Sequence, residues 1–213
     1  MNALVMYDHP TDTLWSQFLS KGVEGPLKDK ELAVIPATQT TWEAWLELHP
    51  DTRALYKGSA RQDPYVGYYE NSNSGVHGQF NPDDRLYGKE LVVGINLDGN
   101  PKAYPFSVLS REQVVNDTIA GEDVLIYFDA YTGTALAFDR SPGDAPLTFS
   151  IEGDPAGART ILIDEQTGSR WTAFTGSAID GELKGSRLER ISSHLSFWFA
   201  WSDWNPQTEI YPN

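Results

Sequence analysis

The sequence contains no cysteine, and this absence excludes several kinds of chemistry. Disulfide bonds, thiolate nucleophiles, iron–sulfur clusters and cysteine-ligated zinc all require a cysteine sulfur, so none of them can form in this chain. A long apolar run is also absent, since no stretch approaches the roughly 18 residues of a membrane-spanning helix. We therefore expect no membrane-spanning segment.

Basic residues are few in comparison with acidic ones. The chain of 213 residues has 16 Lys and Arg against 30 Asp and Glu, which gives a formal net charge of −14. Such a charge repels a phosphate backbone and an anionic membrane surface, so we expect neither nucleic acid nor a membrane as a partner. The acidic residues are spread along the chain, which is typical of a solvated surface.

The N-terminal sequence MNALVMYDHP lacks the basic start and the apolar run of a signal peptide. As the chain stands, this pattern favours a cytoplasmic protein, whereas a signal lost upstream would make it an exported one. The absence of cysteine does not decide between these compartments, because it suits either redox environment.

One segment of the sequence occurs twice. Residues 8–52 align with residues 164–208 without a gap, at an offset of 156. The identical pairs include three of tryptophan, namely Trp15 with Trp171, Trp42 with Trp198, and Trp45 with Trp201. Chance rarely supplies three tryptophan pairs at one offset, so we infer an internal duplication whose period is that of a whole domain.

The duplication divides the chain into three parts. Residues 1–57 correspond to the C-terminal half of a first repeat unit, residues 58–85 form a linker or loop, and residues 86–213 form a complete second unit. We expect 1–57 to pack with 86–213 as one globular body. The first part lacks the strands that precede its counterpart, so its apolar face requires cover from this chain or from another domain or chain. That face consists of Leu4, Met6, Trp15, Phe18, Trp42 and Trp45.

A polar corner with the pattern D-x-x-T-[DG]-[ST] occurs three times, beginning at Asp8, Asp129 and Asp164. An apolar strand precedes it and another strand follows, and such corners join antiparallel strands, with the Asp side chain accepting backbone N–H groups. These aspartates are therefore interpreted as structural. Turn signals elsewhere, including Asp98-Gly99, predict a mainly β fold of antiparallel strands and hairpins with a few short helices, which can also be classed as α+β.

Two short helices are predicted from their boundaries. The stretch PFSVLSREQVV begins with Pro105, which suits a first helical position. The stretch TTWEAWLELHP has Thr40 and Glu43 at capping-box spacing and ends at Pro50.

Tryptophans occur within the second of these predicted helices and within its duplicate. Trp42 and Trp45 lie three residues apart, as do Trp198 and Trp201, and this spacing indicates the core face of a short helix. The alternative is a groove that binds sugars or aromatic compounds. Trp204 has no counterpart in the first copy, so it is the tryptophan that we expect to be exposed.

The four histidines show no pattern of metal ligands. His9, His49, His77 and His194 lack metal-ligand spacing, and none of their duplicate positions holds histidine. We therefore predict no metal site and no cofactor. A G-x-S-x-G nucleophile elbow and a phosphate-binding loop are also absent from the sequence.

Several stretches together resemble a known family. They are MYDHPTDTLWSQ, KELVVGINLDGNPKAYPFSVL, VVNDTIAG, GTALAFDR and FWFAW. In content and order they are similar to the bacterial and archaeal family catalogued as domain of unknown function 3179. The resemblance covers nearly the whole chain and implies two related halves, as the repeat does. It implies no established activity.

The same resemblance implies the loss of soft ligands. The fuller half of family members typically carries YCPLCGTA and, upstream of it, HEIVND. In this chain Asp129 and Thr132 stand at the positions of the two cysteines, and Glu112 stands at that of the histidine. A Cys-x-x-Cys loop near a histidine would suggest metal or thiol-redox work. This copy therefore resembles a degenerate half, and the half with the cysteines is expected to precede Met1.

Two hypotheses for the function follow. The first is a non-catalytic, β-rich structural or ligand-binding module that packs against another domain or chain. The second is a carboxylate-dependent hydrolase acting on glycans or a related polar substrate, and opposed carboxylates ~5–9 Å apart in one cleft would support it. Its candidate catalytic residues are Glu112, Asp117, Asp129 and Asp139. A small-molecule or glycan ligand is compatible with both hypotheses.

Overall fold

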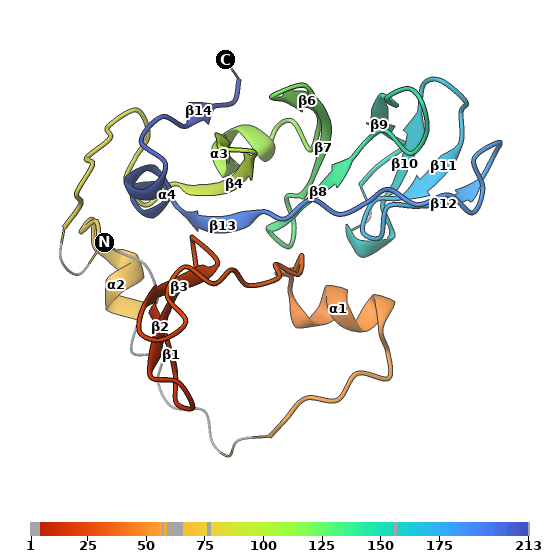
Figure 1. Ribbon diagram of the computed structural model, residues 1–213. Coiled ribbons are helices and arrows are strands. Elements are labelled where there is room, and N and C mark those ends of the chain that lie inside the picture. Colours follow the sequence, from red (N-terminus) through yellow and green to blue (C-terminus); the bar gives the residue numbers. More distant parts are fainter. Residues whose placement is uncertain (1–4, 57, 59–65, 76–77, 156, 213) are drawn as a thin grey trace.

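The computed structural model describes residues 5–56, 58, 66–75, 78–155 and 157–212 (Figure 1). Its elements are short strands in four sheets, together with a few helices of four to seven residues. The predicted mainly β fold is therefore confirmed. Of the face predicted for the first copy, Leu4 lies outside the described residues. None of the described helices is both long and apolar enough to cross a membrane.

Each copy of the repeated segment forms a small antiparallel sheet. The first sheet consists of β1 (Val5–Asp8), β2 (Thr13–Ser16) and β3 (Lys21–Glu24). The second consists of β10 (Ile161–Asp164), β11 (Arg170–Thr172) and β12 (Ser177–Asp180), and β9 (Phe149–Ile151) adds a fourth strand beside β10. In Figure 1 the first sheet lies apart from the second, across the molecule.

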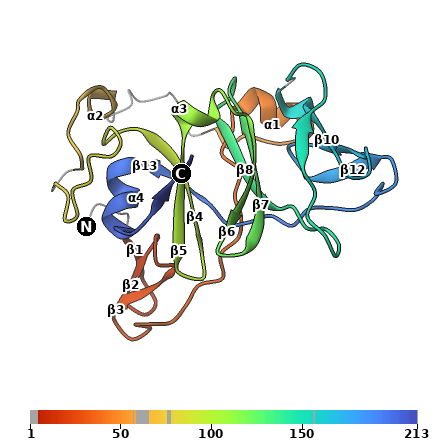
Figure 2. The same cartoon turned by 90° about the horizontal axis from the view of Figure 1, so that it is seen from above.

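Two further sheets lie between these, as the view in Figure 2 shows. One contains β4 (Leu91–Leu97) and β5 (Asn100–Pro105), flanked by β13 (His194–Phe197) and by β14 (Glu209–Ile210). The other contains β6 (Val114–Ile119), β7 (Glu122–Asp129) and β8 (Thr134–Asp139), all antiparallel. Asp98 and Gly99 join β4 to β5 with φ values of 50° and 85°, so the predicted hairpin turn is confirmed.

The helices are α1 (Trp42–Leu48), α2 (Val66–Glu70), α3 (Phe106–Leu109) and α4 (Trp198–Trp204), with a 3₁₀ turn η1 (Gly157–Arg159). Two predicted helix starts were wrong by one residue. The N-cap of α1 is Thr41, whose hydroxyl accepts the Ala44 N–H, whereas the Thr40 hydroxyl accepts a bond from Thr134. Pro105 is the N-cap of α3 and precedes its first turn.

The two copies share their local structure down to individual hydrogen bonds. Strands β1 and β3 and helix α1 recur as β10, β12 and α4 at the offset of 156. The indole N–H of Trp45 donates to Thr52 at 2.9 Å, and that of Trp201 donates to Thr208 at 2.8 Å. These bonds join positions seven residues apart, so each copy can form them without the rest of the protein.

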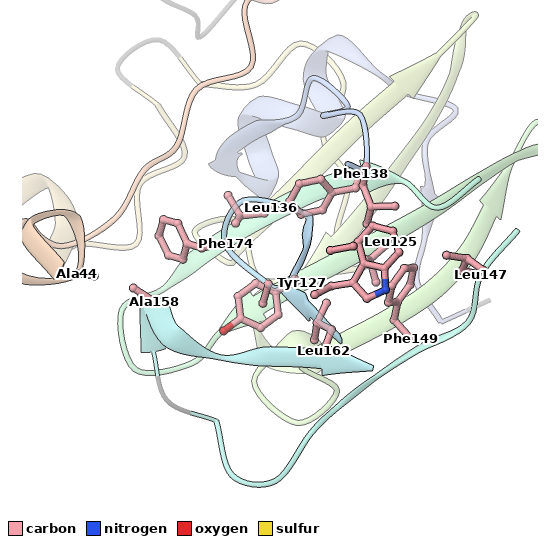
Figure 3. Close-up of a cluster of buried hydrophobic side chains, with 14 residues drawn as sticks. Ala44, Leu125, Tyr127, Leu136, Phe138, Leu147, Phe149, Ala158, Leu162 and Phe174 are labelled. Carbon is pink, nitrogen blue, oxygen red and sulfur yellow. The ribbon is translucent and has the colours of Figure 1, made fainter. Parts of the chain in front are cut away.

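The main core lies between the sheet of β6–β8 and the second copy (Figure 3). Its large side chains include Tyr127, Leu136, Phe138, Phe149, Leu162 and Trp171. Trp171 is completely buried, and its counterpart Trp15 is 8% exposed, so the prediction that both are buried is confirmed. Ala44 of α1 reaches the edge of this cluster, as Figure 3 shows.

The first copy also contacts the rest of the chain away from this core. The ring of Phe18 stacks on His194 at 5.3 Å and on Trp204 at 5.7 Å between ring centroids. The guanidinium of Arg190 donates to the Thr38 hydroxyl at 3.2 Å. Trp204 is thus half-buried, and the expectation that it is exposed was wrong, because Phe18 of the first copy covers it.

We expect Trp171→Ala to lower the free energy of unfolding by ~3–5 kcal/mol, because removal of a buried indole leaves a cavity. Trp42→Ala should cost less than about 1 kcal/mol, because that indole is 51% exposed. Urea unfolding followed by circular dichroism measures both values. Equal losses in the two variants would contradict the difference in burial between these two tryptophans.

Candidate functional site

The three polar corners have one hydrogen-bonding pattern. In each, a threonine hydroxyl donates to the first aspartate, with Thr11 on Asp8 at 2.5 Å and Thr132 on Asp129 at 2.7 Å. In the third corner Asp164 accepts from both the N–H and the hydroxyl of Thr167, and also from the buried Trp171 indole at 2.9 Å. Each corner joins two antiparallel strands, so the structural interpretation of these aspartates is confirmed.

The backbones of the four candidate acids lie at two opposite ends of the sheet of β6–β8. Val124 of β7 is paired with Asp117 on one side and with Asp139 on the other, which places these two acids at one end. Asp129 is the last residue of β7, and Glu112 precedes β6 at the same end. Five residues of extended strand separate the two ends, a distance of ~17 Å. The candidates therefore do not form one carboxylate cluster.

Asp117 belongs to a buried polar cluster. Its carboxylate accepts from the Tyr104 hydroxyl and from the Lys102 ammonium, both at 2.8 Å, and Lys102 is only 5% exposed. Burial acts to raise the pKa of Asp117, but the bonds from Lys102, the Thr118 N–H and Tyr104 outweigh it, so the pKa lies below its usual range. An ionised, fully paired carboxylate of this kind stabilises a buried lysine.

Tyrosines occupy the space next to this cluster. Burial, and then the charge of Asp117, raise the pKa of the Tyr104 hydroxyl. Tyr211 packs against Tyr104 at 5.4 Å between ring centroids and donates to Glu112 at 2.8 Å. Burial, followed by the bond to Glu112, raises the pKa of Tyr211 to about 12. Both tyrosines are therefore neutral hydrogen-bond donors at pH 7.

The other two candidates each have local partners. Asp129 is 4% exposed and accepts the Tyr131 N–H in addition to the Thr132 hydroxyl. Asp139 accepts the Ser141 N–H at 2.8 Å and lines a cavity of about 270 Å³ together with other acidic side chains and Arg190. Asp117 is not among the residues that line this cavity.

The histidines are scattered through the structure, and His77 lies outside the described residues. Burial lowers the pKa of His194, which stacks on Phe18, while His49 packs on Trp45 and His9 on Tyr7. Within the described ranges, no group of three His, Asp or Glu side chains is arranged to hold a metal ion.

The clearest unusual feature of the surface is an apolar face of the first copy, which we call the uncovered face. It consists of Met6, Leu32 and Ile35, which line one cavity of about 260 Å³ and are 38%, 39% and 83% exposed. Their counterparts in the second copy are Leu162, Leu188 and Ile191. Leu162 and Leu188 are almost fully buried, and Ile191 packs on a hydrophobic cluster.

The difference in burial between the two copies extends to their helices, α1 and α4. Trp198 of α4 is completely buried against β4 and β5, whereas its counterpart Trp42 of α1 is 51% exposed. The prediction that Trp42 is a core residue was wrong, and the prediction for Trp198 and Trp201 is confirmed. The physical reason lies outside the helix, because α4 has a sheet to pack on and α1 does not occupy an equivalent position.

The sequence contained one signal for this surface, namely the apolar face that the repeat assigned to the first copy, which included Met6. It did not show that Leu32 and Ile35 belong to the face. These residues follow the sheet in an extended segment, and their counterparts are buried by contacts with distant strands that no local pattern reveals.

The fold and this surface define a mainly β protein with two copies of one segment, one covered and one uncovered. The chain belongs to the family described as protein of unknown function (DUF3179), whose model matches residues 1–208. The resemblance noted in the sequence is thereby confirmed. Comparisons with curated proteins and with solved structures found no match.

We expect the free energy of unfolding of Asp117→Asn to fall less steeply at acid pH than that of the unaltered protein. Since folding lowers the pKa of Asp117, the stability it contributes is complete above the ordinary aspartate pKa of about 4 and is lost as the pH falls through the folded-state pKa. Urea unfolding at a series of pH values between about 6 and 2 measures this. The control, Asp144→Asn, changes an exposed loop residue and should keep the decline of the unaltered protein. Identical curves for both variants would contradict the role of Asp117.

Proposed function

We propose that this protein is a non-catalytic, β-rich structural module that binds another domain or chain through the uncovered face. In this proposal residues 1–57 are the C-terminal half of a repeat unit, residues 58–85 connect it, and residues 86–213 are a complete unit. The observation that carries the proposal is the contrast in exposure between Leu32 and Leu188, which occupy the same position in the two copies.

The chemistry of the face supports a protein partner. Apolar side chains that line a concave surface gain about 25 cal/mol for each Å² removed from water, so a complementary apolar surface is their natural partner. The covered copy offers an analogy for such a partner, because Leu162 and Leu188 belong there to one cluster with side chains of β7, β8 and β9. A β-rich domain or chain with a similar apolar sheet would fit.

The alternative of a carboxylate-dependent glycan hydrolase is not favoured. Asp117 and Asp129 lie at opposite ends of β7, ~17 Å apart along the strand, and Asp117 is not among the residues that line the cavity beside Asp139. Each of the four candidate acids also accepts a hydrogen bond from a neighbouring side chain or backbone group, as Asp117 does from Lys102.

A photo-crosslinking amino acid at position 35, in the full chain and in the cell that makes it, tests the proposal. We expect it to crosslink to one defined polypeptide, because the Ile35 side chain is 83% exposed within the apolar face. The matched control is position 131, where Tyr131 is 85% exposed but lies outside that face.

The crosslinked polypeptide is then purified and titrated against the protein. Ile35→Lys should weaken binding at least tenfold, because a charged group would be desolvated in an apolar contact, while Tyr131→Lys should leave it unchanged. Crosslinks of equal yield from both positions, or binding that Ile35→Lys does not weaken, would refute the proposal.

A further inference from the structure

The fourth strand of the second copy provides a template for what the first copy binds. Strand β9 pairs antiparallel with β10, so that Ile151 lies opposite Leu162 and Phe149 opposite Asp164. The Glu152 N–H donates to the Ile161 carbonyl at 2.9 Å, and the Glu165 N–H donates to the Thr148 carbonyl at 2.9 Å. In an antiparallel ladder, therefore, the backbone groups of Ile161 and Ile163 face β9.

The outer edge of β1 is the equivalent edge in the first copy, and it is unpaired. The sheet order is β1-β2-β3, with Met6 opposite Trp15 and Asp8 opposite Thr13, and no described strand lies beyond β1. By the alternation seen in β10, the backbone groups of Val5 and Tyr7 face outward. Both side chains are 51% exposed. The strand VMYD has neither the lysine nor the proline that commonly protects an edge strand.

A second set of unpaired backbone groups lies in the segment that follows β3. In the second copy the segment after β12 pairs with β8, since the Asp139 N–H donates to the Glu189 carbonyl and the Ile191 N–H donates to the Ala137 carbonyl, both at 2.9 Å. The counterparts in the first copy are the Ala33 carbonyl and the Ile35 N–H. Neither has a hydrogen-bond partner among the described residues. Both sets of groups border the uncovered face, because β1 contributes Met6 to it.

We propose that the partner adds an extended strand antiparallel to β1, in the register that β9 has on β10. This inference rests on the proposed function and specifies its mode of binding. The added strand has apolar residues at two alternating positions, opposite Met6 and Asp8, as Ile151 and Phe149 are opposite Leu162 and Asp164. The backbone ladder supplies affinity, and the two apolar positions supply specificity.

A second copy of this chain fits the edge less well than such a partner. Antiparallel pairing of β1 with itself can place either Tyr7 opposite Tyr7 or Met6 opposite Met6, because both registers join outward-facing backbone groups. In the Tyr7 register the Asp8 side chain of each copy would lie opposite Met6 of the other, which places a carboxylate where β9 provides Ile151. Each copy also has a net charge of −14, so charge favours a different, less acidic chain.

The test uses the full chain and a synthetic peptide with the sequence of residues 147–153, LTFSIEG, which contains β9. Amide hydrogen exchange is followed by NMR with and without saturating peptide. We expect exchange of the Tyr7 N–H to slow by about tenfold or more, because it gains a backbone partner. The Met6 N–H, which faces β2, should not change. A control peptide with aspartate in place of Phe149 and Ile151 should not protect Tyr7.

Two variants of the chain complete the test. Tyr7→Pro removes an outward N–H and no bond to β2, so it should abolish peptide binding in a calorimetric titration. Tyr7→Phe retains that N–H and should bind the peptide as the unaltered chain does. Its only loss is the hydroxyl that donates to Asp12.

Three results would overturn the inference. They are an unprotected Tyr7 N–H at saturating or millimolar peptide, equal protection by the control peptide, and protection without peptide in a chain that sediments as a dimer. The last result would assign the edge to a second copy. If the crosslinked partner binds but Tyr7→Pro does not weaken it, the strand mode fails while the proposed function stands. If position 35 yields no partner, the proposed function itself fails.

Discussion

The small sheet of each copy has an apolar side that must be removed from water, and the rest of the structure depends on how that is done. In the second copy the sheet of β7 and β8 and the strand β9 cover this side and bury Trp171 and Leu162. The buried Asp164 is satisfied there by Thr167 and by the Trp171 indole, so the polar corner and the core stabilise each other. The covering strands bury the apolar side of the sheet, and the polar corner satisfies the buried Asp164.

The first copy obeys the same constraint only in part. Its β2 side is closed, as the burial of Trp15 and Thr13 shows, and Phe18 and Ala44 contact residues of the second copy and of the central sheets. Its β1 side remains open. An open apolar edge of this kind promotes association, which is the physical basis of the binding surface that we propose.

Much of the fold could be predicted from the sequence because it depends on local signals. The sequence places α1 and its duplicate α4 to within one residue, and residues close in the chain predict the corner at Asp129 and the turn at Asp98. Burial could not be predicted in this way. Trp42 and Trp198 have the same local sequence pattern, and only the sheet that faces α4 makes one of them a core residue. The candidate acids illustrate the same limit, since strand register, which sequence spacing does not show, separates Asp117 from Asp129.

The hydrogen bonds that the two copies share bear on how the uncovered face can bind. The bond from Trp45 to Thr52 and the corner bond from Thr11 to Asp8 form within the first copy alone, as their equivalents do in the second. Strand β1 is therefore held in extended form by β2 before any partner arrives. A preformed edge avoids the entropy cost of ordering a free segment, so a short apolar strand can bind it with few contacts. The degree of local order that the first copy retains is what makes strand addition at β1 feasible.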